Sequence, residues 1–375
     1  MARQNLSRRQ FLTRTGLAVG GVAIAPSLLA ACGGGSGGDD KNSVSISNWT
    51  GYVDKADIAA FKKATGLGVT YTEDINDNNE YFAKIQPNLQ KGKSIGRDGF
   101  VLTDWMANRI INEVKWAQPF VASKLPNKAN LLPALSSPAF DPQRKFSLPW
   151  ASGMAGIAYN IALTGKEIKT IDDFIAVSGP TSVLSEMRDT IGLFMLADGK
   201  DITKPTYADA EGAFDRLSRA IDDGEITSFN GNDYVADLGT GNLAAAIAWS
   251  GDVAQITRDN PDIRFAIPDS GGTLWSDNFM IPISSEKPDL ASEWINFFYD
   301  PVNAALLTSF IQYISPVEGV ADELIKLGGD AAKLADDPLV HPTEEVLATL
   351  SIFGPLNEAE EILFDERFAE IQGAG

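Results

Sequence analysis

Trp275 and Asp277 are the residues of this chain whose types and spacing most directly suggest chemistry. They stand two residues apart, so in an extended segment their side chains point to the same side. An indole face attracts a cation through its quadrupole and a carboxylate attracts it through its charge, so the pair suits an ammonium group. The alternative is a core tryptophan followed by an acid in a turn, because Gly271 and Gly272 end one expected segment and the apolar run 279–283 begins the next.

The composition is that of an ordinary globular protein with a strongly acidic balance. The chain has 375 residues, 44% hydrophobic and 22% charged, which is long enough for two lobes that each have a core. The formal net charge is −19. Residues 1–31 hold four of the 31 basic residues and no acid, so without them 27 basic residues face 50 acidic ones. Such a surface repels nucleic acid and attracts cations, so we expect no nucleic-acid binding.

A single Cys and a single His limit the chemistry that this chain can perform. A disulfide within one chain is impossible and a Cys/His metal cluster is excluded, so we expect neither metal nor cofactor. His341 lies between Val340 and Pro342, and no recognisable nucleophile motif is near it. A pair of acids of the glycosidase type stays open, so an exported hydrolase is the enzyme alternative.

The amino terminus reads as an export address. Segment 7–12 (SRRQFL) resembles a twin-arginine signal, and a short, glycine-containing apolar stretch follows at 17–29. The next residues, 29–32 (LAAC), look like a bacterial lipobox, so we expect residues 1–31 to be removed and Cys32 to be lipidated. Residues 32–43 then form a tether at the outer face of a membrane. The alternative is a plain cleaved signal with an incidental Cys.

The first part of the folded chain alternates strands and helices, which is typical of a parallel sheet covered on both faces. The expected elements are a strand at 44–47, a helix at 55–65, a strand at 67–72, a helix at 81–90 bent or broken at Pro87, and a strand at 99–102. Ligands of such sheets lie beyond the carboxyl ends of the strands. Segments 48–52 (NWTGY) and 103–105 (TDW) occupy that position.

The rest of the chain supplies further candidates. Small residues at 148–160 suit a crossing between two lobes, and 314–316, directly after Tyr313, suits a second crossing. Ser185 can cap a helix whose first turn holds Glu186 and Asp189, and these acids could equally stabilise that helix through its dipole. Other expected elements are helices at 171–175, 210–223, 291–299 and 358–371, a buried run at 243–248 ending at Trp249, and a strand at 263–267.

Taken in order, several of these segments resemble the spermidine/putrescine-binding proteins of bacterial ABC transporters. The resemblance is carried by 48–52, the run 149–160, Trp249 in its apolar run, and 275–277 leading to Ile281 and Pro282. It implies an α/β fold, two-lobed and periplasmic-binding-protein-like (type II), in which each lobe is a mixed sheet flanked by helices. We expect lobe 1 to comprise 44–151 and 277–313, and lobe 2 to comprise 152–276 and 314–375.

The resemblance also implies a polyamine in the cleft between the lobes. Thr103 and Trp105 replace a serine and a tyrosine of the family, and Glu186 and Asp189 match its acid pair with the two types exchanged. A late amide contact of the family falls on Gly354, which puts the hold on one end of a longer ligand in doubt. The implied ligand-binding residues are Trp49, Thr50, Tyr52, Thr103, Trp105, Glu186, Asp189, Trp249, Trp275, Asp277 and Tyr313.

The expected function is capture of spermidine or putrescine outside the cytoplasm by a lipid-anchored monomer, followed by delivery to an ABC permease. Methylenes gain from aromatic contact and each ammonium requires acceptors, and this set of residues provides both. No catalytic step is expected. The main alternative is a two-lobed binding lipoprotein for a sugar, an amino acid or iron, since aromatic walls also suit sugars. A sensing role is compatible with the same pocket.

Overall fold

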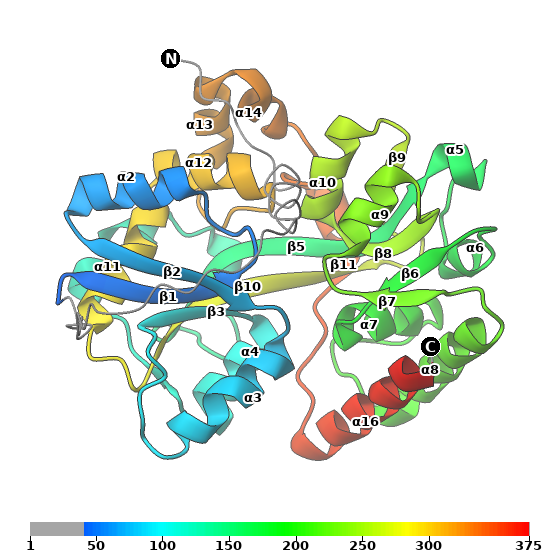
Figure 1. The fold of residues 1–375 in the computed structure, drawn as a ribbon, viewed down its shortest axis with the longest axis horizontal. Coiled ribbons are helices and arrows are strands. Elements are labelled where there is room, and N and C mark those ends of the chain that lie inside the picture. Colours follow the sequence, from blue (N-terminus) through cyan, green and yellow to red (C-terminus); the bar gives the residue numbers. More distant parts are fainter. Residues whose placement is uncertain (1–40, 375) are drawn as a thin grey trace, which may run out of the picture.

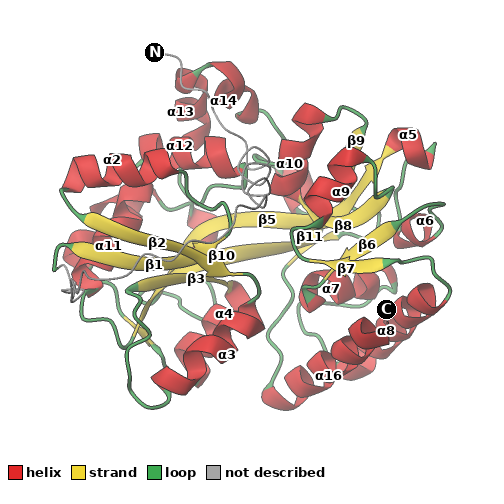
Figure 2. Cartoon of the chain, in the orientation of Figure 1, coloured by secondary structure: helices red, strands yellow, loops and turns green. Residues whose placement is uncertain are grey.

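Two lobes lie side by side along a long mixed sheet with helices on its faces (Figures 1 and 2). This is a computed structural model that describes residues 41–374. The expected signal peptide and Cys32, with most of the tether, lie outside the described residues. None of the helices between residues 41 and 374 has the length and apolarity needed to span a bilayer. The strand order is β2-β1-β3-β10-β5-β8-β6-β7.

The first lobe begins with the expected alternation of strands and helices. Strands β1 and β2 pair in parallel, and β1 also pairs in parallel with β3, which confirms the predicted parallel unit. Its elements are β1 (Ser43–Trp49), α2 (Lys55–Thr65), β2 (Gly68–Ile75), α3 (Asn78–Leu89), β3 (Gly99–Thr103), α4 (Asp104–Asn108), a π-helical turn (Arg109–Glu113), β4 (Ala117–Gln118) and short 3₁₀ turns at Ala122–Lys124, Pro126–Asn130 and Pro133–Leu135.

Helices cover both faces of this sheet because each has one apolar side. Phe61 of α2 packs in a core with Ile46 of β1, whereas Phe82 of α3 packs with Phe100 of β3 in a separate core. Helix α2 ends at Gly66, which adopts the left-handed conformation (φ 76°) that favours glycine. Helix α3 continues through Pro87 to Leu89.

Strands β5 (Ser147–Asn160) and β10 (Gly272–Pro282) run through both lobes (Figure 1). The first part of β5 pairs with β10, and its last residues pair with β8 and β9 of the second lobe. In the same way β10 pairs with β3 at one end and with β11 at the other. The extended conformation predicted for Trp275 and Asp277 is confirmed, because both lie in β10. The strand begins at Gly272 and not at Phe279 as expected, because pairing on both sides keeps it continuous apart from a bulge between Asp277 and Asn278.

The second lobe surrounds its own core, in which buried side chains of β6 and β8 meet those of the helices on both sides. Strand β8 is parallel to β6, and β6 is parallel to β7. The elements are α5 (Ile161–Thr164), α6 (Ile171–Ile175), β6 (Thr181–Leu184), α7 (Met187–Ala197), α8 (Tyr207–Asp222), β7 (Ser228–Asn230), α9 (Tyr234–Thr240), β8 (Ala245–Trp249), α10 (Ser250–Asp259) and β9 (Ile263–Ala266).

The carboxyl-terminal part of the chain first stays with lobe 1 and then crosses to lobe 2. Ile314 exchanges two backbone hydrogen bonds with Ser152, at 3.0 and 2.9 Å. Val317, Leu324 and Val340 are then buried in the lobe 1 core, Leu339 packs against both cores, and Phe353 and later residues are buried in the lobe 2 core. The elements are α11 (Pro288–Phe298), α12 (Pro301–Ile311), α13 (Val320–Leu327), α14 (Gly329–Leu334), α15 (Glu344–Leu347), β11 (Leu350–Ser351) and α16 (Glu358–Ala374).

This packing differs from the predicted second crossing at 314–316. The segment pairs with Ser152 and leads into α13, so the chain changes lobes after Val340, between α14 and β11. We therefore propose that lobe 1 includes residues 314–340. The spacing of apolar residues in 314–340 does not show which lobe this segment packs against, because a helix on either lobe has one apolar side.

Candidate ligand-binding site

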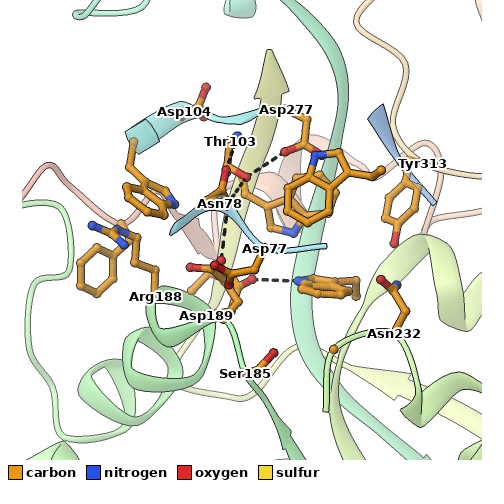
Figure 3. A pocket seen from close by; sticks show the side chains of 18 of the residues that line it. Asp77, Asn78, Thr103, Asp104, Ser185, Arg188, Asp189, Asn232, Asp277 and Tyr313 are labelled. Atoms are coloured by element: carbon orange, nitrogen blue, oxygen red, sulfur yellow. Dashed lines mark hydrogen bonds between the residues drawn. The ribbon is translucent and has the colours of Figure 1, made fainter. Parts of the chain in front are cut away.

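One pocket between the lobes is lined by all the residues that the sequence singled out for ligand contact. Figure 3 labels Thr103, Asp189, Asp277 and Tyr313 among them. The space between its walls measures about 880 Å³, with open solvent at the mouth included. Its lining consists of Trp49, Thr50, Tyr52, Asn76, Asp77, Asn78, Thr103, Asp104, Trp105, Ser185, Glu186, Arg188, Asp189, Gly231, Asn232, Trp249, Thr273, Leu274, Trp275, Asp277, Tyr313, Ile352 and Phe353.

Strand ends place the side chains of the first wall. Trp49 is the last residue of β1 and Thr103 is the last residue of β3. The two strands are parallel neighbours, so their carboxyl ends meet at one edge of the sheet. Trp249 likewise ends β8 in the second lobe. The positional argument made from the sequence therefore explains why these side chains share a pocket.

Asp277 is a buried carboxylate that accepts two hydroxyl donors from lobe 1. Tyr52 Oη donates to its Oδ2 at 2.9 Å and Thr103 Oγ1 donates to its Oδ1 at 2.8 Å. The side chain is only 3% exposed. Burial raises the pKa of the Asp277 carboxyl to about 7, although the two hydroxyl donors act in the opposite direction. Burial disfavours the ionised form of Asp277 in the empty pocket. A cation bound beside it would therefore favour the ionised carboxylate.

Glu186 and Asp189 form the acidic wall on the lobe 2 side. Asp189 accepts from Trp249 Nε1 at 2.8 Å and from Thr273 Oγ1 at 2.5 Å, and burial raises its pKa above the ordinary value. The side chain of Glu186 is half-buried and lies within the cleft. Burial and, next, the negative charge of Asp77 raise the pKa of Glu186 to about 8.

The start of α7 differs from the prediction that Ser185 caps it. The cap position belongs to Glu186, whose side chain makes no capping hydrogen bond. Ser185 instead donates its backbone N–H to the carbonyl of Asn230, and it lines the pocket. The helix therefore begins one residue later than predicted. Glu186 occupies the cap position with its backbone, and its carboxylate is not used as a cap.

Aromatic rings occupy the pocket between the two acidic walls. The rings of Trp275 and Tyr313 lie 5.3 Å apart between centroids, and those of Tyr52 and Tyr313 lie 5.9 Å apart. Trp275 lies against Gly153 of β5, where an added Cβ would stand 2.3 Å from the indole ring. Tyr313 was expected to contact the ligand, but its hydroxyl donates to Asp252 Oδ1 at 3.0 Å. Tyr313 therefore contributes its ring face to the pocket.

Asn78 is a pocket residue that the sequence argument missed. Its Nδ2 donates to Thr103 Oγ1 at 3.0 Å and approaches Glu186 Oε2 at 3.5 Å, and its Oδ1 accepts from the backbone N–H of Thr103 at 3.0 Å. Asn78 thus joins the two acidic walls. The signal was present, because β2 ends at Ile75 and the polar run 76–79 (NDNN) follows that strand end.

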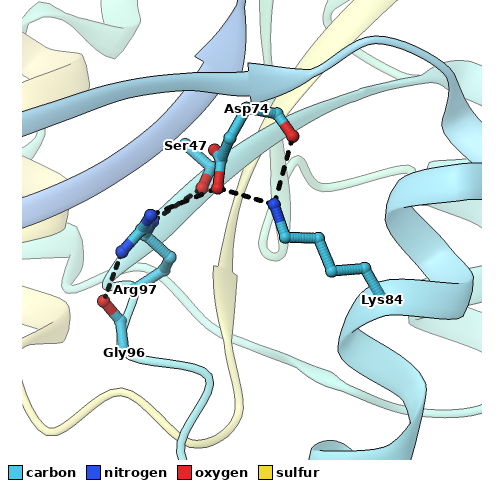
Figure 4. Close-up of polar contacts among 5 residues, drawn as sticks. All are labelled: Ser47, Asp74, Lys84, Gly96 and Arg97. Carbon is cyan, nitrogen blue, oxygen red and sulfur yellow. Dashed lines mark hydrogen bonds and ion pairs between the residues drawn. The ribbon is translucent and has the colours of Figure 1, made fainter.

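An ion-pair cluster holds the end of β2, just before the loop that leads to Asn78 at the start of α3 (Figure 4). Asp74, near the end of β2, accepts from Lys84 of α3 at 2.9 Å and from Arg97 at 3.2 Å. Arg97 Nε also donates to Ser47 of β1 at 2.8 Å. These contacts link β1, β2 and α3 around the loop between β2 and α3, so they restrict where its polar run can lie.

Arg188 is a positive side chain in an otherwise acidic lining, and the sequence argument did not predict it. Arg188 is labelled in Figure 3, and its guanidinium carbon lies 3.4 Å from the ring centroid of Trp105. Its Nη2 donates to both carboxylate oxygens of Glu361 in α16, at 2.8 and 2.7 Å. Arg188 is 4% exposed. One face of the Trp105 ring is therefore covered by this guanidinium.

Two further expectations concern the carboxyl-terminal segment and metals. Gly354 does not line the pocket, and its backbone N–H donates to Ile202 at 2.8 Å. Its neighbours Ile352 and Phe353 line the pocket instead.

Among residues 41–374, no group of three or more His, Cys, Asp or Glu side chains has the arrangement needed to hold a metal ion.

In a comparison with protein-family models, one model matches most of the described chain. Residues 56–342 match the model of the bacterial extracellular solute-binding proteins. The chain belongs to this family. Members of this family are extracellular proteins that bind solutes. At the level of the family, the chain is therefore a solute-binding protein that acts outside the cytoplasm, and the family is not one of enzymes.

Named relatives align over nearly the whole length of this solute-binding protein. The putrescine-binding periplasmic protein PotF of Escherichia coli (strain K12) is 27% identical over 353 residues, which covers 87% of this chain and 90% of PotF. The spermidine/putrescine-binding periplasmic protein of the same organism is 25% identical over 334 residues, 88% of this chain and 90% of that protein.

A solved structure supports the fold. The spermidine/putrescine ABC transporter substrate-binding protein PotD from Streptococcus pneumoniae strain Canada MDR_19A superposes with a TM-score of 0.73 at 23% identity. The match covers 89% of this chain and 99% of that chain. This solute-binding protein therefore has the two-lobed, type II periplasmic-binding-protein fold that the sequence predicted.

Proposed function

We propose that this solute-binding protein captures a polyamine, spermidine or putrescine, in the pocket between its lobes and delivers it to the permease of an ABC transporter. The carrying observation is the charge pattern of the pocket. Carboxylates line the pocket on both lobes, with Asp277 and Asp189 buried and Glu186 half-buried, and aromatic rings lie between them. A ligand with an ammonium at each end and methylenes between satisfies both kinds of surface.

The names of the relatives point the same way. PotF is named for putrescine, and the second relative from the same organism is named for spermidine and putrescine. The proposed ligand contacts are those expected from the sequence, with Trp249 and Trp275 on either side of the methylenes, Trp49 on the first wall and Asp277 at one ammonium. Lipidation at Cys32, a monomeric state and a position at the outer face of the membrane belong to the same proposal.

A calorimetric titration tests the proposed ligand class. The purified protein is titrated with putrescine, spermidine, spermine and a neutral sugar. We expect saturable heat with at least one amine and none with the sugar. Sugar binding without amine binding would reject the proposal and favour the alternative solute. Hydrolysis of an amine conjugate or glycoside by the protein would favour the exported hydrolase.

The membrane part of the proposal has its own test. In cells, we expect a Cys32→Ser variant to lose the membrane association of the unmodified protein, because the only thiol that can carry the lipid is gone. Equal membrane association of both forms would leave the lipid anchor unsupported and would not affect the ligand proposal.

A further inference from the structure

We propose that Asp77 of lobe 1 is a further ligand-binding residue, and that it and Glu186 of lobe 2 hold the same ammonium group between them. This inference rests on the proposed function, since it takes the ligand to be an amine. Asp77 is not among the ligand contacts expected from the sequence, which place only the lobe 2 acids Glu186 and Asp189 at this end of the ligand. The shared ammonium would connect the two lobes directly.

The fold fixes the position of Asp77. It is the N-cap residue of α3, and its Oδ1 accepts the backbone N–H of Glu80 at 2.9 Å. The next residue, Asn78, is 1% exposed and forms two hydrogen bonds of 3.0 Å with Thr103, one to its hydroxyl and one from its backbone N–H. Asn78 Nδ2 also approaches Glu186 Oε2 at 3.5 Å. The start of α3 is therefore anchored in lobe 1 and lies against Glu186 of lobe 2.

Asp77 and Glu186 face the same space. Both line the pocket, and Figure 3 labels Asp77 among the lining residues. Burial and then the negative charge of Asp77 raise the pKa of Glu186, so the two carboxylates are close enough to repel each other. The two lobes therefore bring like charges together at this end of the pocket.

The pocket lining contains one cation, and that cation is already engaged. Arg188 is the only basic residue among the described residues that line the pocket. Its Nη2 donates to both carboxylate oxygens of Glu361, at 2.8 and 2.7 Å, and its guanidinium covers one face of Trp105. Its charge lowers the pKa of Glu186, yet burial and Asp77 outweigh it. The repulsion between Asp77 and Glu186 is therefore left for a ligand to relieve.

An ammonium between the two carboxylates would turn this repulsion into attraction. Each carboxylate would accept a charge-assisted hydrogen bond from the same group. Both contacts form only while the two lobes lie against each other, so the bound ammonium would also favour the closed arrangement over an open one. Asp77 would then contribute to affinity although it belongs to the opposite lobe from the acid pair of α7.

Asp77→Asn removes the charge and keeps the helix cap, because asparagine is as good an N-cap residue as aspartate. Calorimetry with putrescine and with spermidine at pH 8 gives the Kd values. We expect the Kd of the amine that binds the unmodified protein to rise at least tenfold in the variant. Losing the charge of Asp77 also makes Glu186 easier to ionise. This opposing effect shrinks as pH rises to the pKa of Glu186, about 8, which sets the pH of the test.

Asp300→Asn is the matched control. Asp300 is the N-cap residue of α12, where its Oδ1 accepts the backbone N–H of Val302 at 3.0 Å, and it does not line the pocket. This variant changes the net charge by the same amount and removes the same kind of capping carboxylate, so its Kd should be unchanged. If thermal melting shows that Asp77→Asn is unfolded, Asp77→Ser decides, because serine also caps a helix without a charge.

The outcomes separate this inference from the proposed function. A rise in Kd in the folded Asp77 variant that is no larger than the rise in Asp300→Asn would overturn the role of Asp77 and leave amine binding intact. Absence of heat with both amines in the unmodified protein would instead reject the proposed function.

Discussion

Asp277 and Glu186 show how a single residue can favour ligand binding and oppose folding at the same time. Burial raises the pKa of both carboxyls, to about 7 and about 8, so ionising either one in the empty pocket costs free energy. An ammonium beside them would supply the charge partner that the protein itself does not. The same two groups therefore link ligand binding to proton release.

Replacing Asp277 by Asn should weaken amine binding by on the order of 3–5 kcal/mol, which is more than a hundredfold in Kd. The amide keeps the shape of the side chain but leaves one ammonium without a charge partner. Calorimetric titration with putrescine measures the effect. Asp222→Asn, an exposed position of α8, is the control and should bind as the unmodified protein does. Comparable affinity in both variants would contradict the assigned role.

Replacing Glu186 by Gln should stabilise the ligand-free protein at pH 8 by about 1 kcal/mol or more. The pKa of Glu186 is raised on folding, so its contribution to stability is fully present below the ordinary pKa of 4.5 and is lost as pH rises toward about 8. Glutamine removes this loss. Urea unfolding at pH 5 and pH 8 measures it, and a gain confined to pH 8 is expected.

The opposite result would be equally clear. If Glu186→Gln destabilises the ligand-free protein at both pH values, the carboxyl contributes a native contact that outweighs the cost of its burial. In either case the variant should bind putrescine more weakly, because one ammonium loses its acceptor.

At the scale of elements, the pairing of β5 with β10 sets the position of the aromatic wall. Trp275 stands opposite Gly153 in the antiparallel register, and the indole ring covers the space where a side chain would be. A glycine is therefore required on β5 for this ring to lie flat against the strand. The requirement is one of close approach, and the sequence alone does not reveal it.

Gly153→Ala should weaken amine binding about tenfold or more while the protein remains folded, because the added methyl would stand 2.3 Å from the indole ring and must displace it. Calorimetry gives the Kd, and near-ultraviolet circular dichroism reports the changed tryptophan environment. Gly212→Ala, at an exposed position of α8, is the control and should bind normally. Normal binding by Gly153→Ala would show that the ring position does not matter.

The elements also show what the sequence could predict and what it could not. The alternation of strand and helix predicted the parallel unit of β1, β2 and β3, and the rule of strand ends found Trp49 and Thr103. The same rule applied to β2 would have found Asn78. The start of β10 at Gly272, well before the expected start at Phe279, and the packing of α13 and α14 on lobe 1 depend on neighbours distant in sequence. Local patterns do not contain that information.

At the scale of the whole molecule, net charge should control how fast a cationic ligand arrives. The formal charge is −19, and the proposed ligand carries two or more positive charges. The attraction acts over about 10 Å at 0.1 M salt and is screened over shorter distances as salt increases. We expect the association rate of putrescine, followed by stopped-flow tryptophan fluorescence, to fall several-fold between 20 mM and 300 mM sodium chloride.

The dissociation rate should change much less, because the bound ammonium groups are buried beside their carboxylates. As a control, the viscosity of the solution is kept constant while the sodium chloride concentration is varied. An association rate independent of salt would show that the acidic surface plays no part in capture.

Sharing of β5 and β10 between the lobes means that the protein cannot be divided into two halves that fold separately. Each of these strands forms hydrogen bonds in lobe 1 with one part of its length and in lobe 2 with the other. Cutting the chain at either strand would leave both halves with an unpaired sheet edge, which is a site of aggregation. Insertions and fusion partners therefore belong on outer loops, and the two halves must be made, exported and degraded as one piece.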